Sequence, residues 1–135
     1  MAGLSDYSEI GVLNAMLRGI NFTAPATNSL RLALFFADPT DSGTVNEISG
    51  AWYARTLTGA WNNPSAVGST YQSSNVASIT FAPVTGASVT VTHIGIFDAS
   101  VAGNMLFSAP LTSSKTLQIG DVLSFAGNSI VIQLD

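Results

Sequence analysis

The sequence contains no cysteine and very few charged side chains. Because none of its 135 residues is Cys, disulfides and thiolate metal sites are excluded. Only 9% of the residues are charged, against roughly 25% in an ordinary soluble domain. The polar surface must instead come from 17 Ser, 13 Thr and 9 Asn. Such a surface provides little repulsion between copies, so it suits either a subunit of a larger assembly or a secreted or surface β-domain.

Positive charge and long apolar runs are also scarce. Three Arg and one Lys oppose eight carboxylates, which gives a net charge of −4. The absence of a basic run predicts no nucleic-acid partner. No segment approaches the roughly 20 apolar residues of a membrane span, so we also predict no membrane partner. The first residues carry acids where a signal peptide needs cations, and we therefore expect assembly in a cytoplasm.

Residues suited to catalysis are missing or badly spaced. The only histidine, His93, is five residues from Asp98 in a predicted strand, and an odd separation places the two side chains on opposite faces. No nucleophile elbow, Walker A or dinucleotide motif occurs. The segment Asp38–Glu47 offers oxygen ligands for Ca²⁺ without EF-hand spacing, which leaves a bound cation as an open alternative. We predict that the protein is not an enzyme, with no catalytic residue, cofactor or metal.

The N-terminal segment is predicted to be a helix that starts at Ser5 or Asp6 and ends at Gly19. Its apolar residues recur at steps of three and four, with Ala15 and Met16 broadening the stripe. The candidate interface residues of this stripe are Tyr7, Ile10, Leu13 and Leu17. Two interpretations stay open: the stripe covers one end of a sheet core, or it is an arm that docks on a neighbouring subunit.

The rest of the chain is predicted to be β-structure, because short alternating segments are separated by Gly, Pro and Asn turn signals. The expected strands are residues 30–36, 53–58, 78–81, 88–97, 104–110, 116–119, 122–125 and 129–134. Residues 61–75 are expected to form a long polar loop. The predicted fold is a mainly β, antiparallel β-sandwich or jelly-roll-like domain with one N-terminal α-helix. It forms a single domain over 1–135, with a helical arm at 1–19 and a β-domain at 20–135.

Two aromatic residues of the expected loop are further candidates for a partner interface. Trp61 and Tyr71 lie among small polar residues, where aromatic rings can stack on sugars or anchor a protein contact. For Trp61 the alternative is that the ring holds the loop against the domain. Trp52 is expected in the core.

Several blocks of the sequence carry a family resemblance. They are LSDYSE (4–9), TAPATNSLRLALFFADPTDSG (23–43), EISGAWYAR (47–55), VTHIGIFDA (91–99) and the closing stretch 103–135, with its K-T turn, G-D turn and terminal LD. Read together, they resemble a family of small tailed-phage structural proteins that are described as tail-fibre-like or as capsid decoration (cement) proteins. Residues 61–75 depart from the family's pattern.

The resemblance implies a virion component without catalytic residues. The expected function is a capsid decoration protein on the capsid surface, assembled in the host cytoplasm, that stabilises the lattice of its partner, the major capsid protein. A homo-oligomer is expected, with a trimer as the natural choice at three-fold positions. The alternative is a tail-fibre or receptor-binding module that contacts host surface glycans.

Overall fold

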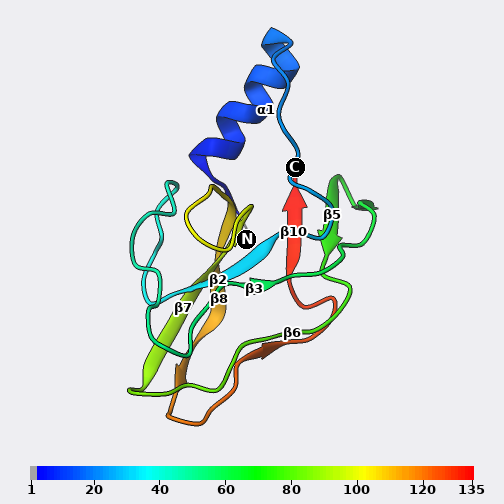
Figure 1. The fold of residues 1–135 in the computed structure, drawn as a ribbon. Coiled ribbons are helices and arrows are strands. Elements are labelled where there is room, and N and C mark those ends of the chain that lie inside the picture. Colours follow the sequence, from blue (N-terminus) through cyan, green and yellow to red (C-terminus); the bar gives the residue numbers. More distant parts are fainter. Residues whose placement is uncertain (1–2) are drawn as a thin grey trace.

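The protein is mainly β, with antiparallel sheets and a helix at its N-terminal end (Figure 1). This arrangement is seen in a computed structural model that describes residues 3–135. The elements are β1 (Gly3–Leu4), α1 (Asp6–Arg18), β2 (Arg31–Phe35), β3 (Thr56–Leu57), β4 (Ser65–Val67), β5 (Thr70–Ser74), β6 (Ile79–Thr80), β7 (Val89–Phe97), β8 (Met105–Leu117), β9 (Ser124–Phe125) and β10 (Val131–Leu134). The predicted β-sandwich class with one N-terminal helix is confirmed.

Helix α1 begins and ends where its capping residues require. Ser5 is the N-cap, and its side-chain oxygen accepts a hydrogen bond from the Ser8 N–H at 3.3 Å. Of the two caps that the sequence allows, Ser5 is therefore the one used. At the other end Gly19 adopts the left-handed conformation (φ 66°), which satisfies a helix carbonyl and stops the helix.

A short strand that the sequence did not predict ties the start of α1 to the sheet. Strand β1 pairs with β8, with Gly3 opposite Ser108. Directly after it, the Ser5 N–H donates to the Leu106 carbonyl at 3.0 Å, and the Ser5 hydroxyl donates to the Met105 carbonyl. The base of the helix is thus anchored on β8.

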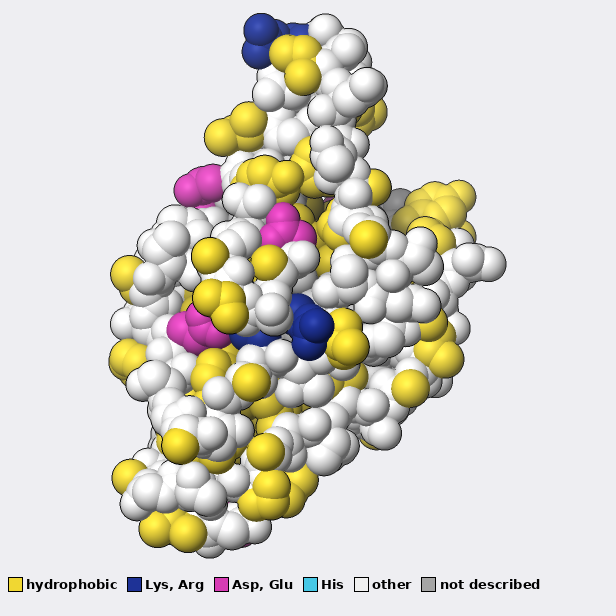
Figure 2. All heavy atoms as spheres, viewed as in Figure 1, with side chains coloured by type: hydrophobic (Ala, Val, Ile, Leu, Met, Phe, Trp, Pro, Cys, Tyr) yellow, Lys and Arg dark blue, Asp and Glu magenta, His cyan; other side chains and the backbone are white. Residues whose placement is uncertain are grey.

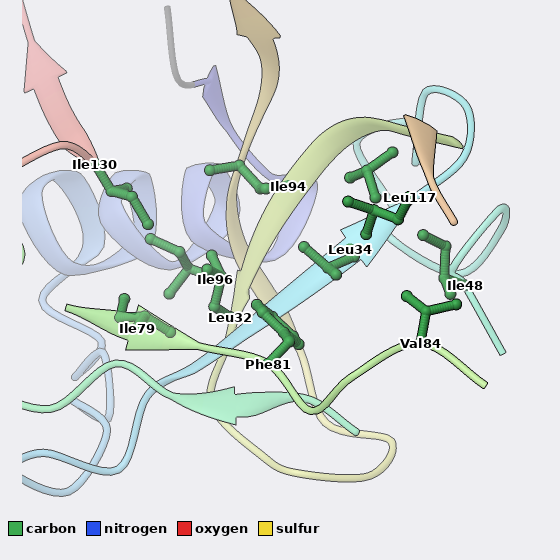
Figure 3. Close-up of a cluster of buried hydrophobic side chains, with 11 residues drawn as sticks. Leu32, Leu34, Ile48, Ile79, Phe81, Val84, Ile94, Ile96, Leu117 and Ile130 are labelled. Carbon is green, nitrogen blue, oxygen red and sulfur yellow. The ribbon is translucent and has the colours of Figure 1, made fainter. Parts of the chain in front are cut away.

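The main sheet has the strand order β1-β8-β7-β2-β3, and its central strands separate two apolar clusters. Leu32 and Leu34 of β2 face the larger cluster, which also holds Ile94 and Ile96 of β7 (Figure 3). The alternate β2 residues face a smaller cluster on the other side of the sheet. That cluster consists of Ala33, Phe35, Phe97 and Met105. Because both faces of β2 are covered, its sequence is nearly continuously apolar.

The expected polar loop at 61–75 was wrong, since most of it forms a hairpin. Strands β4 and β5 pair around a two-residue turn at Gly68 and Ser69, and Gly68 takes a positive φ of 62° that a tight turn favours. Strand β5 also pairs with β10, which makes a second sheet of order β10-β5-β4. The small polar side chains of this segment hid the strand pattern.

Two further strand predictions were corrected by the structure. Residues 105–110 and 116–117 of the two predicted segments belong to the one strand β8, and the expected break is a bulge in which Leu111–Ser114 lie opposite Thr92. The strand expected at 53–58 is reduced to β3, because the Tyr53 N–H closes a turn by donating to the Gly50 carbonyl.

Candidate assembly site: the helical arm and the open side of the sandwich

Helix α1 projects from the β-sheets as an arm (Figure 1). Its base is held by β1 and by Ser5, and among its residues only Ser8 is buried. A space-filling view shows apolar side chains along this projecting part of the molecule (Figure 2). The arm therefore does not cover the sheet core, and the first of the two interpretations of its apolar stripe was wrong.

The apolar stripe of the arm faces solvent. The exposed fractions are 61% for Ile10, 58% for Leu13, 78% for Leu17 and 79% for Met16. We call these four residues the arm stripe. Single exposed aliphatic residues are common on proteins, whereas these four lie together on one helix face, which makes them a candidate contact surface.

Tyr7 lies apart from the arm stripe, on the helix face against which Phe22 packs, and is still 37% exposed. Its ring packs against Phe22 of the returning chain, with 5.7 Å between ring centroids. Phe22 also fills the space beside Gly11, where an added Cβ would lie 2.2 Å from the Phe22 Cδ2 atom. The predicted interface residues of the helix are thus divided: Tyr7 is used within the chain, whereas Ile10, Leu13 and Leu17 are free to contact a partner.

The sandwich is open on one side. A cavity of about 490 Å³ separates β8 from the segment 123–132, and its lining is mostly apolar but includes five Ser and Thr residues. We call it the groove. Its partly buried apolar residues include Phe107, Ala109, Leu111, Leu123, Phe125 and Ile132. Lys115 is the only charged residue in its lining.

The groove runs beside a free strand edge. Strand β1 pairs with β8 at Phe107 and Ser108, and among residues 3–135 no strand pairs with the rest of that outer edge. Pro110, which has no N–H to donate, lies in this stretch, as is typical of edge strands. This side of the sandwich therefore combines a strand edge that has free backbone groups with a groove that contains partly exposed apolar side chains.

Trp61 and Tyr71 lie together at a second, smaller cavity of about 270 Å³. The Trp61 indole N–H donates to the Thr58 hydroxyl at 3.0 Å, and its ring packs against the main cluster. Trp61 therefore holds its segment against the domain, as the alternative prediction had it, whereas Tyr71 is 61% exposed. Trp52 is partly buried against the same cluster, in agreement with its predicted place.

This second cavity adjoins the groove, and its lining offers few hydrogen-bonding groups to a sugar. Ile96, Phe107 and Ile132 line both cavities. The remaining residues of the second cavity are Leu30, Trp61, Pro64, Tyr71, Gln72, Ser73 and Leu134. Sugar recognition requires several placed hydrogen-bonding groups, and this lining is mostly apolar. The surface is better suited to a protein contact.

A partly buried polar network that the sequence analysis missed connects β2 to two loops. The Arg55 guanidinium binds the Glu47 carboxylate in a bidentate pair at 2.8 and 2.7 Å, and the Tyr53 hydroxyl donates to the same carboxylate at 2.7 Å. Arg55 also donates to the Ala102 carbonyl at 2.6 Å and lies 3.6 Å from the centre of the Phe97 ring. The signal was present in the block EISGAWYAR, which holds all three polar residues.

Burial and hydrogen bonding have opposite effects on the pKa of Glu47 in this network. Burial alone would raise the pKa of Glu47, but the hydrogen bonds from Arg55 and Tyr53 and the Arg55 charge hold that pKa below its ordinary value. Burial raises the pKa of Tyr53, and its hydrogen bond to Glu47 raises it further, although the bond from the Leu34 N–H opposes the shift. The network is therefore a structural brace rather than an acid–base pair poised near neutrality.

His93, Asp98 and Glu47, which the sequence analysis considered for catalysis or metal binding, interact with other residues of the chain. His93 Nδ1 lies 2.9 Å from the Thr92 hydroxyl, which fits the predicted hydrogen-bonded structural role. Asp98 accepts from the Asn104 N–H at 2.7 Å. Within the described part of the chain no three His, Cys, Asp or Glu side chains gather as a metal site, and Glu47 faces Arg55 instead of the other acids near it. The described residues also include no helix long and apolar enough to cross a membrane.

The chain is thus an antiparallel β-sandwich that carries an anchored arm with exposed apolar residues and has a groove on one side. Comparison with family models identifies the family itself. Residues 3–133 match the family described as "Podophage GP4 fiber I protein gp80", and the chain belongs to this family. A search of curated proteins gives no match. The predicted family of small tailed-phage structural proteins is confirmed, and the chain is a virion structural protein.

Proposed function

We propose that this protein is a non-catalytic subunit of a phage fibre, joined to the virion assembly through the α1 arm. The single observation that carries the proposal is the arm stripe, which is more than half exposed on a helix that is firmly anchored at its base. A 13-residue helix is marginally stable by itself in water, so a helix of this kind gains from a partner. The fibre description of the family supports this location.

Capsid decoration is the second candidate, favoured by the charge-poor surface. With 9% charged residues, the protein suits a lattice in which each weak contact is repeated many times. In that case the partner would be the major capsid protein, and the arm would staple the β-domain to the shell. A receptor-binding role for Trp61 and Tyr71 has less support, because Trp61 is committed to Thr58.

The copy number of the protein in purified virions separates the two candidates. Quantitative mass spectrometry against the major capsid protein would give a low, fixed number of copies per particle for a fibre subunit. A ratio near one copy per capsid subunit would instead support decoration of the shell. Complete absence from purified particles would overturn both.

The role of the arm is tested by incorporation into virions. We expect Leu13→Glu to reduce incorporation strongly, since it places a charge in the arm stripe. The matched control is Ala15→Glu, which adds the same charge. Ala15 was expected to broaden the stripe, but it lies about 200° around the helix from Leu13 and therefore outside the arm stripe. Equal incorporation of both variants would contradict a function of the arm in assembly.

A further inference from the structure

We propose that the arm stripe of one copy binds in the groove of a second copy of this chain. The inference rests on the proposed function as an assembled subunit and specifies what covers the arm. Residues 3–135 present two apolar surfaces that no other described part of the chain covers: a convex stripe on α1 and a concave groove between β8 and the segment 123–132. One contact between copies buries both.

The spacing of the arm stripe fits a helix that lies in a groove. Ile10, Leu13 and Leu17 occupy positions i, i+3 and i+7, the pattern by which amphipathic helices bind hydrophobic grooves. A bundle of the same helices from several copies is the competing arrangement. Stable coiled coils are typically indicated by three or four heptads, whereas α1 has 13 residues, or fewer than two. The short helix therefore favours the groove.

Charge complementarity supports the same pairing. Lys115 is the only lysine of the chain and, among the residues that the structure describes, the only charged one that lines the groove. The first turn of α1 carries Asp6 and Glu9, which are both exposed. On a helical projection Glu9 lies beside Leu13 and Met16, at the margin of the arm stripe. An arm bound in the groove can thus place the Glu9 carboxylate near Lys115 while the arm stripe packs against the apolar lining.

The contact is directional, because the arm of one copy meets the groove of the next. Heterologous contacts of this kind produce a closed ring when the rotation between copies closes, and an open filament when it does not. With α1 about 20 Å long, the arm can extend beyond the body of its own chain to reach a neighbour.

Engineered cysteines test the pairing directly, since the chain has none of its own. Met16→Cys marks the arm, and Ser113→Cys marks the exposed rim of the groove. After the two full-length variants are mixed and mildly oxidised, we expect the Met16→Cys/Ser113→Cys heterodimer to dominate over either homodimer. Dominance of the Met16→Cys homodimer would indicate a helix bundle and would overturn the proposal, as would the absence of any cross-link.

A charge exchange gives a second readout that a helix bundle does not share. Glu9→Lys and Lys115→Glu should each weaken self-association about threefold by sedimentation, and the combined variant should restore it. Glu9→Gln controls for the loss of the acid near the helix start. Additive weakening in the combined variant would contradict the pairing of Glu9 with Lys115.

The outcomes also separate this inference from the proposed function. If Leu13→Glu abolishes incorporation into virions but no arm-to-groove cross-link forms, the arm binds a different virion protein and only the inference fails. If the cross-link forms in solution but the protein is absent from virions, the self-contact stands and the proposed function fails.

Discussion

The centre of the main sheet and the α1 arm use apolar side chains in opposite ways. In β2 every apolar residue is fully buried, on one face or the other, whereas the arm stripe is 58% to 79% exposed. Both segments have the regular periodicity of their element, and both are anchored by hydrogen bonds. The difference teaches that a regular apolar pattern predicts the face on which apolar side chains gather, but not whether the folded chain buries that face.

The largest effect is expected in the sheet centre. Leu34→Ala should lower the free energy of unfolding by about 3 kcal/mol, because the side chain is fully buried and its removal leaves a cavity. Urea unfolding followed by fluorescence would measure the change. A loss below about 1 kcal/mol would show that the centre is packed less tightly than its burial indicates.

A second large effect is expected where β5 joins β10. Asn75 is fully buried, and its side chain donates to the carbonyls of Ala77 and Ala126 and accepts from the Ile130 N–H, at 2.8 to 2.9 Å. Asn75→Ala should cost about 2 to 3 kcal/mol, since buried backbone groups lose their partners. Asn63→Ala, at an exposed position, is the matched control in the same urea experiment. Equal stability of the two variants would rule out a special role for Asn75.

Elements that depend on residues close together in the sequence were predictable, whereas elements that depend on pairing with distant segments were not. The helix limits were predictable because Ser5 and Gly19 act on adjacent backbone, and the predicted strands 88–97 and 129–134 carry their own alternation. The 65–74 hairpin was not, because Ser, Thr and Gln give no apolar contrast between the two faces. The β8 bulge became visible only from its pairing with β7.

Of the candidate site, the sequence predicted the exposed residues of the helix, but neither the packing of Tyr7 and Trp61 within the chain nor the groove. Periodicity identified the arm stripe, yet the same spacing serves a helix that covers its own core and one that docks elsewhere. The position of Tyr7 could not be predicted because Phe22 reaches it from beyond the helix. The groove joins β7, β8 and the segment 123–132, so it depends on tertiary packing that no local pattern encodes.

An intermediate effect on stability is expected in the polar network of Glu47, Tyr53 and Arg55. Glu47→Gln should destabilise the protein by about 2 kcal/mol near neutral pH, because Arg55 and Tyr53 lose their charged partner in a partly buried position. Asp41→Asn, at an exposed acid of the same region, serves as the control. Comparable losses in both variants would show that the brace adds little to the packing around it.

The difference in unfolding free energy between the wild type and Glu47→Gln should also depend on pH. Because folding lowers the pKa of Glu47 below its ordinary value of 4.5, the carboxylate contributes stability above that value and loses it as the pH falls through the lower, folded pKa. The gap in unfolding free energy between the wild type and Glu47→Gln should therefore be largest near neutrality and narrow below about pH 4.5. A gap that is constant from pH 7 to pH 3 would contradict this account.

The smallest effect on the isolated chain is expected in the arm. Leu17→Ala removes as many carbon atoms as Leu34→Ala, but Leu17 is 78% exposed, so the unfolding free energy should change by less than about 0.5 kcal/mol. The measurement belongs at a protein concentration low enough to separate the copies, because assembly would add its own stabilisation. As the concentration rises, the wild type should gain stability that Leu17→Ala does not. Leu17 would then contribute to stability, as Leu34 does, only when copies associate. A difference in unfolding free energy between the wild type and Leu17→Ala that does not change with concentration would show that Leu17 acts within its own chain.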